Sequence, residues 1–304
     1  MFLRILGCGS ATPTTLRNPS AFLLTFENKK RIFLIDCSEG TQLRMRANGV
    51  RMQNITHIFI SHLHGDHFFG LIGLLSTQSL LGRTEPIHIF AHKPLKKIIN
   101  MQLKIEKSRL TFPLIFHPLK KSKKASVIWS EKELEIVTFP LLHSIPANGF
   151  IFKEKKVSVK IKPELLAKHS LTTKQKGKVI RGHDYITHRG EVFKNKDITY
   201  IEEKIKSFSY CSDTAYTESF IDYIKGTDLL YHEATFMEDL AEVAAKKQHS
   251  TAKQAAAVAL KADAKQLLIG HYSARYVNIH PLLEEAQSIF PNTIAAQEGH
   301  IEQI

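Results

Sequence analysis

The residues best suited to chemistry form one short string, Ser61-His62-Leu63-His64-Gly65-Asp66-His67. Imidazole and carboxylate groups are the ligands that zinc prefers, and three histidines with an aspartate in six residues are hard to explain by packing. His62 and His64 alternate along the chain, so both can face one metal ion, whereas Asp66 and His67 fall beyond the turn. The preceding apolar run His57–Ile60 predicts a strand. The sequence therefore predicts a metal site in the loop after this strand.

This string is similar to the signature of the metallo-β-lactamase superfamily, whose fold is an αββα sandwich. The resemblance implies three more ligands downstream, and His143, Asp213 and His271 match them in order. A lone histidine is usually structural, but each of the three residues comes just after a predicted strand. The resemblance therefore implies an α/β fold of this sandwich type and a complete set of ligands.

The ligand set fits two divalent ions, for which we expect Zn²⁺, while Mn²⁺ or Fe²⁺ would accept the same ligands. One ion would take His62, His64 and His143; the other would take Asp66, His67 and His271, with Asp213 shared. Two such ions ~3.5–4 Å apart lower the pKa of a water molecule and stabilise an in-line displacement at phosphorus. Asp66 is also our candidate to orient that water or accept its proton.

Three further strings resemble the ribonuclease Z (tRNase Z) family within that superfamily. They are Pro13-Thr14-Thr15-Leu16-Arg17-Asn18, His232-Glu233-Ala234-Thr235 followed by His249-Ser250-Thr251, and His271-Tyr272-Ser273-Ala274-Arg275-Tyr276. The resemblance implies an endoribonuclease that removes the 3′ trailer of precursor tRNA, cutting near the discriminator nucleotide and leaving a 3′-hydroxyl. It also implies a homodimer.

The same resemblance assigns roles to residues outside the ligand set. It implies that His249, poised by Glu233, protonates the departing 3′ oxygen, which a histidine can do near its pKa. Ser273 and Arg275 would hold a phosphate or the terminal nucleotide, and Arg17 is a third candidate for RNA binding, because arginine suits bidentate phosphate contacts. The alternatives are a helix-capping role for His249 and a surface salt bridge for Arg17.

Composition fits a soluble nucleic-acid enzyme. The 304 residues are 43% hydrophobic and 23% charged, with a net charge of +13. Such an excess points first to nucleic acid and second to an anionic membrane surface. The apolar stretches are too short to span a bilayer, so we expect no membrane segment. The single cysteines Cys8, Cys37 and Cys211 favour a reducing compartment, and we expect a cytoplasmic enzyme.

The elements that must position these residues alternate between strands and helices in both halves of the chain, which predicts two packed sheets with helices outside. Predicted strands are Phe2–Leu6, Phe22–Phe26, Ile32–Ile35, His57–Ile60, Ile87–Phe90, Leu134–Phe139, Phe208–Cys211, Leu229–Tyr231 and Gln266–Ile269. Predicted helices are Ser38–Asn48, Phe68–Leu81, Tyr216–Lys225, Thr251–Ala262 and Pro281–Ile289.

One stretch interrupts this pattern. Between residues 153 and 206, fifteen Lys or Arg residues face seven acidic ones, without clear periodicity. We interpret residues 153–197 as a basic arm inserted in a single domain that spans residues 1–304, although a solvated surface meander is the alternative. The arm of this family usually carries a glycine-proline motif, whereas this stretch has only Pro163 and no adjacent Gly-Pro pair. The departure affects recognition of tRNA more than cleavage.

Two rival functions share much of this pattern. Another superfamily hydrolase, acting on small esters, thioesters or phosphodiesters, would have the same ligands; the basic charge, the arm and the string after His271 favour a polyanionic substrate instead. A catalytically silent tRNA-binding protein would be expected to lose ligands, and all seven are present. The string Gly7-Cys8-Gly9-Ser10-Ala11-Thr12 begins like a dinucleotide fingerprint but lacks the third glycine, so we interpret it as a turn.

Overall fold

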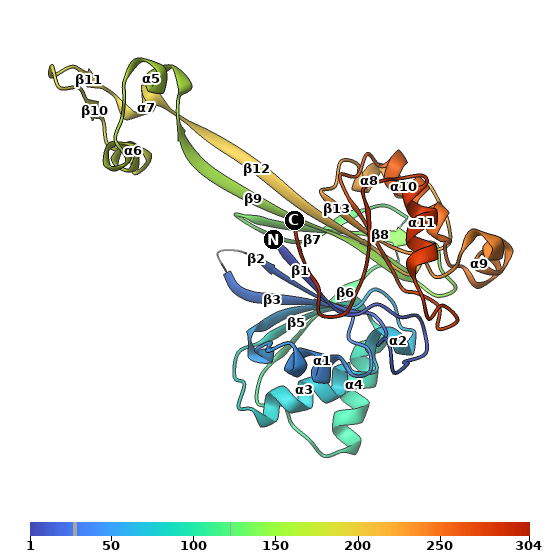
Figure 1. The fold of residues 1–304 in the computed structure, drawn as a ribbon. Coiled ribbons are helices and arrows are strands. Elements are labelled where there is room, and N and C mark those ends of the chain that lie inside the picture. Colours follow the sequence, from blue (N-terminus) through green and yellow to red (C-terminus); the bar gives the residue numbers. More distant parts are fainter. Residues whose placement is uncertain (27–28, 122) are drawn as a thin grey trace.

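The computed structural model describes residues 1–26, 29–121 and 123–304. Two β-sheets pack face to face, and helices cover their outer faces (Figure 1). This arrangement confirms the predicted αββα sandwich. Among the described residues, no helix is both long enough and apolar enough to cross a membrane.

The first sheet combines an antiparallel part with a run of parallel strands. Its strands lie in the order β16-β1-β2-β3-β4-β5-β6, and β3 to β6 run parallel. Their bounds are β1 Phe2–Gly7, β2 Ala21–Phe26, β3 Lys29–Ile35, β4 Ile55–Phe59, β5 Ile87–His92, β6 Leu114–Leu119 and β16 Ile301–Gln303.

The second sheet has the same mixed character, in the order β15-β14-β13-β12-β9-β8-β7. Strands β12 to β15 run parallel, and β9 is antiparallel to both β12 and β8. The bounds are β7 Ser126–Glu131, β8 Leu134–Leu141, β9 Ala147–Ile161, β12 Thr199–Cys211, β13 Leu229–Glu233, β14 Leu267–Gly270 and β15 Thr293–Ala295.

Helices on the first sheet lie in the first half of the chain, and those on the second sheet lie in the last third. The former are α1 Thr41–Ala47, η1 Met52–Asn54, α2 Gly65–Phe68, α3 Leu71–Leu80 and α4 Pro94–Ile105. The latter are α8 Ile221–Ile224, η2 Glu238–Leu240, α9 Ala241–Lys247, α10 Ala252–Lys261 and α11 His280–Gln287. The helix predicted over Tyr216–Lys225 is wrong in its first half, where the Thr217 hydroxyl accepts a hydrogen bond from the Ser219 backbone and forms a turn instead.

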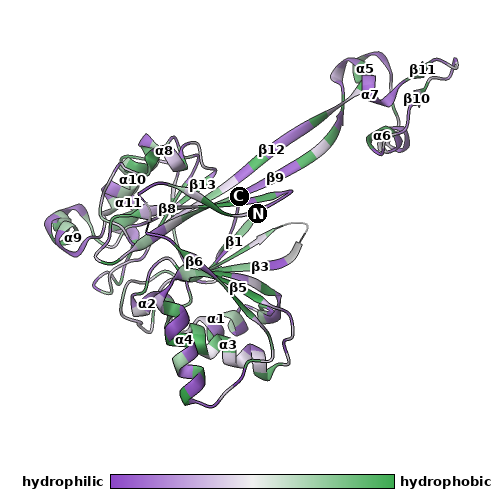
Figure 2. Cartoon of the chain, turned by 180° about the vertical axis from the view of Figure 1, so that it is seen from behind, coloured by the Kyte–Doolittle hydropathy of each residue, from purple (hydrophilic) through white to green (hydrophobic). Residues whose placement is uncertain are grey.

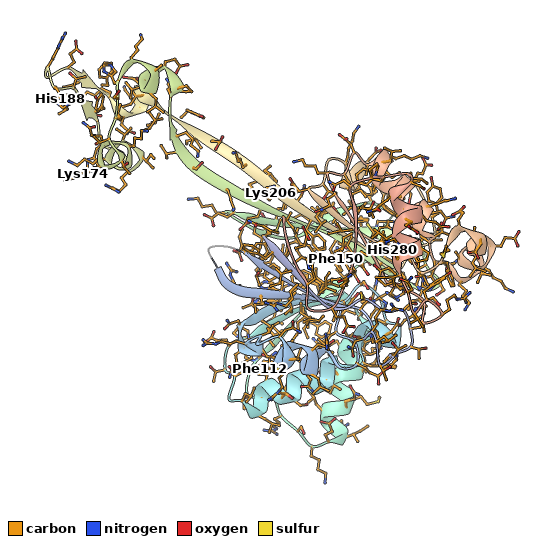
Figure 3. All side chains as sticks on the ribbon, in the orientation of Figure 1. Phe112, Phe150, Lys174, His188, Lys206 and His280 are labelled. Carbon is orange, nitrogen blue, oxygen red and sulfur yellow. The ribbon has the colours of Figure 1, made fainter. Side chains whose placement is uncertain are left out.

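The core divides into an inter-sheet layer and a layer under the first set of helices. The inter-sheet layer is rich in aromatic rings, including Phe22, Phe59, Phe150 and Tyr210, which are fully buried. Figure 2 shows these central strands as hydrophobic bands, and Figure 3 places Phe150 inside the sandwich. Burial of such large apolar side chains is the main force that holds the two sheets together.

A long arm projects from the second sheet (Figure 1). Strands β9 and β12 pair from Phe150 with Tyr210 out to Ile161 with Thr199, and their outer part extends beyond the neighbouring strands. The tip comprises α5 Pro163–Lys168, α6 Thr173–Ile180, β10 Tyr185–Ile186, β11 Val192–Phe193 and α7 Asn195–Ile198. A small apolar cluster that includes Leu165, Val179 and Tyr185 holds the tip together. The basic stretch predicted at 153–197 lies within this projection.

The topology brings distant parts of the chain to one edge of the sandwich. Parallel strands end at the same edge of a sheet, and open α/β sheets bind ligands there. The predicted ligands follow β4 in the first sheet and β8, β12 and β14 in the second, and these strand ends face one another across the sandwich.

Candidate metal centre and catalytic site

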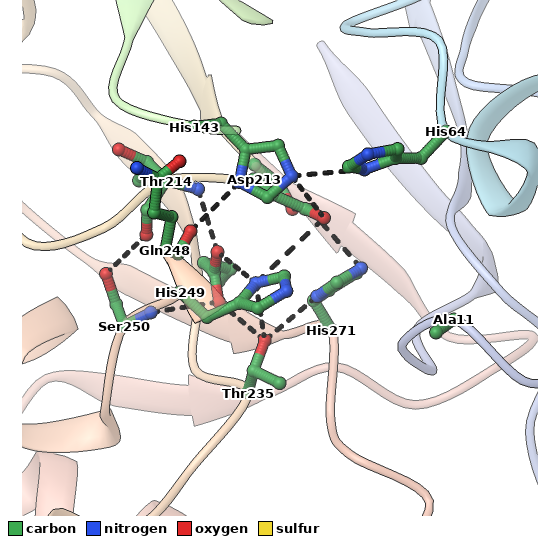
Figure 4. A network of polar contacts seen from close by, with 12 residues as sticks. Ala11, His64, His143, Asp213, Thr214, Thr235, Gln248, His249, Ser250 and His271 are labelled. Carbon is green, nitrogen blue, oxygen red and sulfur yellow. Dashed lines mark hydrogen bonds and ion pairs between the residues drawn. The ribbon is translucent and has the colours of Figure 1, made fainter. Parts of the chain in front are cut away.

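The structure brings all seven predicted ligands together at this edge. Among the described residues, three groups of donor atoms form, each with its atoms within 4.8 Å of one another. The two main groups hold the predicted ligands: the first is His62, His64, His143 and Asp213, and the second is Asp66, His67, Asp213 and His271. The third, Asp213, Glu233, His249 and His271, shares residues with the second. Figure 4 shows Asp213 between His64 and His143 on one side and His271 on the other.

The two carboxylate oxygens of Asp213 face different groups. Its Oδ2 atom lies 3.7 Å from His62 Nε2 and 3.9 Å from His143 Nε2. Its Oδ1 atom lies 3.4 Å from His67 Nε2 and 3.2 Å from His271 Nε2. Asp213 itself is only 2% exposed, so solvent contributes little to balancing its charge. Each oxygen of Asp213 is therefore directed at a different group of histidines.

The spacing within the groups suits metal ions. His64 Nδ1 lies 3.1 Å from both His62 Nε2 and His143 Nε2. Tetrahedral zinc with bonds of about 2.0–2.1 Å to nitrogen places its ligand atoms roughly 3.3 Å apart. In the second group, the Nε2 atoms of His67 and His271 are buried and have no hydrogen-bond partner among the described residues. Buried polar atoms without partners are costly, and a bound cation would satisfy them.

Hydrogen bonds on the far side of the rings fix the tautomers. His67 Nδ1 lies 2.7 Å from Asp36 Oδ2, and His143 Nδ1 lies 2.9 Å from the Gln248 carbonyl oxygen. Both partners are acceptors, so each Nδ1 carries the proton and each Nε2 presents a lone pair to the cluster. Such partners orient ligands and make them more basic. The donor set therefore fits divalent metal ions.

Asp36 contacts the candidate site and was not identified from the sequence. Besides His67, its Oδ2 atom accepts a hydrogen bond from Tyr210 Oη at 2.7 Å, and its Oδ1 atom accepts one from the Ser61 backbone at 2.8 Å. Asp36 directly follows β3, just as the predicted ligands follow their strands. The same signal, a polar residue after a predicted strand, would have identified it.

The pair His249 and Glu233 lies beside both main groups, and the His249 ring is 5.3 Å from that of His143 and 5.4 Å from that of His271. His249 Nδ1 is 2.8 Å from Glu233 Oε1 and 4.0 Å from Asp213 Oδ2. Glu233 is the last residue of β13 and is fully buried; it also accepts a hydrogen bond from the Thr214 backbone at 2.8 Å. Because Glu233 holds Nδ1, the Nε2 atom of His249 is the ring nitrogen left for a substrate.

Charge in the site acts strongly on His249. Burial lowers the pKa of its imidazole, but Glu233, together with Asp213 and Asp66, outweighs burial and raises this pKa to about 9. Burial conversely raises the pKa of the Glu233 carboxyl, and His249 brings it below its usual value. The two groups therefore stabilise each other as an ion pair.

The loop that follows β1 also reaches the site. The Ala11 backbone N–H donates a hydrogen bond to Asp66 Oδ2 at 2.8 Å, and the other contacts of that oxygen are His67 Nε2 and His271 Nε2, each at 3.6 Å. The turn predicted at residues 7–12 thus holds a ligand in place.

The predicted RNA-binding residues lie next to one another beyond His271. Arg275 is exposed, receives support from the Ser273 hydroxyl at 3.2 Å, and stacks its guanidinium 5.0 Å from the centre of the Phe236 ring. Arg17 differs, because its guanidinium donates to the backbone carbonyls of Tyr276 and Val277. Arg17 therefore fixes the loop that carries Arg275.

Comparisons with known proteins cover almost the whole chain. Ribonuclease Z of Cytophaga hutchinsonii is 45% identical over 298 residues, which cover 98% of this chain and 94% of that protein. Ribonuclease Z of Bacteroides fragilis is 40% identical over 297 residues, which cover 98% and 97%. The chain belongs to the ribonuclease Z family. The predictions of this family and of an endoribonuclease are confirmed.

A family model and two solved structures are also similar to this chain. A family model described as Anti-Pycsar protein Apyc1 matches residues 1–198, a range that ends before Asp213, His249 and His271. Human tRNase Z, short form, has a TM-score of 0.73 at 25% identity and covers 100% of this chain and 99% of its own. A metallo-β-lactamase fold protein of Bacillus subtilis has a TM-score of 0.68 at 17% identity, covering 99% and 98%, and supports the fold alone.

Proposed function

We propose that this protein is a zinc-dependent endoribonuclease that removes the 3′ trailer of precursor tRNA. In this proposal it cuts next to the discriminator nucleotide and leaves a 3′-hydroxyl on the tRNA. The observation that carries the proposal is Asp213, whose two oxygens face two separate groups of histidines in a chain 40–45% identical to ribonuclease Z proteins. Such a pair of cation sites is suited to displacement at a phosphodiester.

The metal sites would supply electrostatic and acid-base chemistry. Divalent ions held by the two groups would lower the pKa of water in the site and stabilise the charge that develops on the phosphate. Asp66 has a fixed position for orienting the attacking water, because Ala11 and the two neighbouring histidines hold its Oδ2 atom. In this role Asp66 is both a ligand and the residue that accepts the proton.

His249 is proposed to act on the leaving group. As the water oxygen bonds to phosphorus, the bond from phosphorus to the 3′ oxygen breaks, and His249 gives its Nε2 proton to that oxygen. Glu233 holds the ring in the required orientation through Nδ1. The products are a tRNA with a 3′-hydroxyl and a trailer with a 5′-phosphate.

Recognition of the RNA is proposed to use two surfaces. Arg275 and Ser273, with the loop that Arg17 fixes, lie beside His271 and would hold the terminal nucleotide of the tRNA. The arm carries many exposed cations, among them Lys174, which Figure 3 shows at its tip, and would bind the body of the tRNA. The tip binds without the glycine-proline motif, through its charge.

We also propose a cytoplasmic homodimer. The described cysteines are free and buried, which suits a reducing compartment. Apolar side chains are exposed along α4 and beside α2, including Met101 at 64%, Ile105 at 73% and Phe69 at 61%. A second copy of the chain would cover this surface. Light scattering of the purified protein tests the assembly.

The deciding experiment is incubation of the zinc-loaded protein with a 3′-extended tRNA, followed by mapping of the cut and its termini. We expect one cut after the discriminator nucleotide, a 3′-hydroxyl on the tRNA and a 5′-phosphate on the trailer. Asp213→Ala serves as the inactive control. An intact tRNA together with rapid hydrolysis of small esters, thioesters or cyclic phosphodiesters would replace this proposal with that of a small-molecule hydrolase.

A further inference from the structure

A basic pocket opens beside the metal site, next to His143. It encloses about 390 Å³ and is lined by Lys120, Lys121, Lys123, His92 and the loop from Pro140 to Asn148. His143 lines this pocket and is also a member of the first ligand group. The pocket and the metal site therefore share a wall.

The topology of the first sheet explains why the cations gather there. The parallel strands β4, β5 and β6 end at one edge, and each end delivers functional side chains. The metal-binding loop follows β4, His92 is the last residue of β5, and Lys120 directly follows β6. Because β4, β5 and β6 are neighbours in the sheet, the lysines after β6 lie two strands away from the metal-binding loop after β4.

Charge in the pocket has one sign. Lys120, Lys121 and Lys123 are exposed, and none of them forms an ion pair with an acidic residue in the described parts of the chain. The described residues that line the pocket include no aspartate or glutamate. Cations that the protein leaves without partners around a concave surface favour an anionic ligand.

Two buried polar side chains, His92 and Asn148, line the pocket. His92 is 7% exposed, and its Nε2 atom has no hydrogen-bond partner among the described residues. Asn148 is 5% exposed and is fixed by hydrogen bonds to the Thr138 hydroxyl at 3.0 Å and the Ser61 carbonyl at 3.0 Å. This buried part of the pocket is therefore polar, and the hydrogen bond from the Asn148 backbone to Ser61 connects it to the metal-binding loop.

The position of the pocket indicates which part of a bound precursor tRNA would contact it. The proposed binding residues for the mature tRNA end lie beyond His271, next to the second ligand group. The pocket lies beyond His143, next to the first group; Figure 4 shows His143 and His271 on different sides of Asp213. A single strand that crosses the site from the tRNA side therefore leaves it through the pocket.

We infer that the pocket of Lys120, Lys121, Lys123 and His92 is a subsite that binds the backbone phosphates of the 3′ trailer, directly after the scissile phosphate. This assignment rests on the proposed function. The subsite makes cleavage depend on trailer length, because a trailer of one nucleotide has no phosphate beyond the scissile one. It also holds the strand on both sides of the cut, which aligns the phosphate for attack.

The test uses the triple variant Lys120→Gln, Lys121→Gln, Lys123→Gln of the full, metal-loaded protein. With a trailer of four nucleotides we expect kcat/KM to fall about 10-fold or more and the salt dependence to flatten by about one phosphate contact. With a trailer of one nucleotide the change should stay within about twofold, since the lost contact is absent there. The matched control Arg51→Gln, Lys132→Gln, Lys225→Gln removes the same charge from exposed positions elsewhere and should leave cleavage of both substrates unaffected.

A chemical change in the RNA identifies the contact directly. Replacing the phosphate after the scissile one with a neutral methylphosphonate should weaken cleavage by the wild type but not by the triple lysine variant, because the two changes remove the same interaction. Equal losses on both trailer lengths, or additive effects of the methylphosphonate and the lysine changes, would overturn the assignment.

Binding separates this subsite from the proposed reaction. A 5′-phosphorylated tetranucleotide should bind the wild type about 10-fold more tightly than the triple lysine variant. If the wild type leaves 3′-extended tRNA uncut but shows this binding difference, the phosphate site holds and the proposed reaction falls. If the tRNA is cut as proposed and the tetranucleotide binds both proteins equally, the subsite assignment falls.

Discussion

Asp213 joins two clusters of histidines through one carboxylate. Its oxygens face different groups, and it is nearly inaccessible to solvent. We expect Asp213→Ala to lose most bound metal and all nuclease activity, because one substitution removes a ligand from both groups. Metal analysis of the purified variant checks this, with Asp184→Ala in the arm as a control. Two full equivalents of metal and normal turnover would contradict the shared-ligand assignment.

His249 occupies a different position, because it contacts the ligands without belonging to either of the two main groups. We expect His249→Ala to retain its metal and to slow cleavage by roughly 10²-fold or more, the usual contribution of a general acid. A substrate with a good leaving group should partly restore the rate, since less proton transfer is needed. An unchanged rate on a poor leaving group would leave His249 as a structural residue at a helix end.

Asp228 is a residue whose ionisation supports the fold away from the metal site. It accepts hydrogen bonds from the Ser207 backbone at 2.9 Å and from Lys265 Nζ at 2.8 Å. Burial raises the pKa of its carboxyl, but Lys265 and Ser207 outweigh burial and bring it below the ordinary value of 3.8. A carboxyl with a lower pKa in the folded chain stabilises the fold above its unfolded pKa, and this contribution is lost as the pH falls through the folded pKa.

Asp228→Asn should therefore lower the free energy of unfolding near neutral pH by about 1 kcal/mol, the net contribution of a typical hydrogen bond, because the exposed Lys265 is screened by solvent. The difference from the wild type should shrink as the pH falls below 3.8. Urea unfolding of both metal-free proteins at several pH values measures it. A difference that stays constant with pH would show that the ionisation of Asp228 contributes nothing.

Sequence was informative for individual ligands and much less so for their partners. The cluster from His62 to His67 is dense enough to predict chemistry from spacing alone, and the later ligands each follow a strand. The Ala11 backbone N–H carries no side-chain signal, so its contact with Asp66 depends on the three-dimensional path of the loop. The carbonyl of Gln248, which orients His143, escapes prediction for the same reason.

At the scale of elements, buried strands were predictable and exposed ones were not. Strands such as β4 and β13 are compact apolar runs, and the predictions placed them within two residues. The outer parts of β9 and β12 carry charged residues on both faces, so the alternation that marks a half-buried strand is missing. These two segments are extended because they form backbone hydrogen bonds with each other, and not because one face is buried. Helix α4, Pro94–Ile105, was also missed.

The arm offers a deletion that the register of its strands makes simple. Ile161 and Thr199 lie directly opposite each other, so a two-residue Asn-Gly turn can replace residues 162–198 and close the ribbon. We expect this variant to keep its metal and any activity on bis(p-nitrophenyl) phosphate, because the ligands lie outside the deletion. It should bind tRNA more weakly and with a flatter salt dependence. Unchanged tRNA affinity in the folded, metal-loaded variant would move recognition elsewhere.

At the scale of the whole molecule, metal ions would fasten the two sheets to each other. The ligands from 62 to 67 come from the first sheet, whereas His143, Asp213 and His271 come from the second. A ligand that binds only the folded state raises stability by about 2.7 kcal/mol at one hundred times its Kd. We therefore expect removal of metal with a chelator to lower Tm, and readdition of zinc to restore it. Calorimetry with and without chelator measures the shift.

The order of the ligands along the chain also determines when each ligand group is complete during translation. A ribosome makes the protein from its N-terminus, and the first group is complete only once Asp213 has been made, while the second must wait for His271. The ribbon of the arm is complete once β12 has been made, which ends at Cys211 and precedes His271 by sixty residues. A chain that stops between these two points would therefore carry the proposed RNA-binding arm without a complete second ligand group.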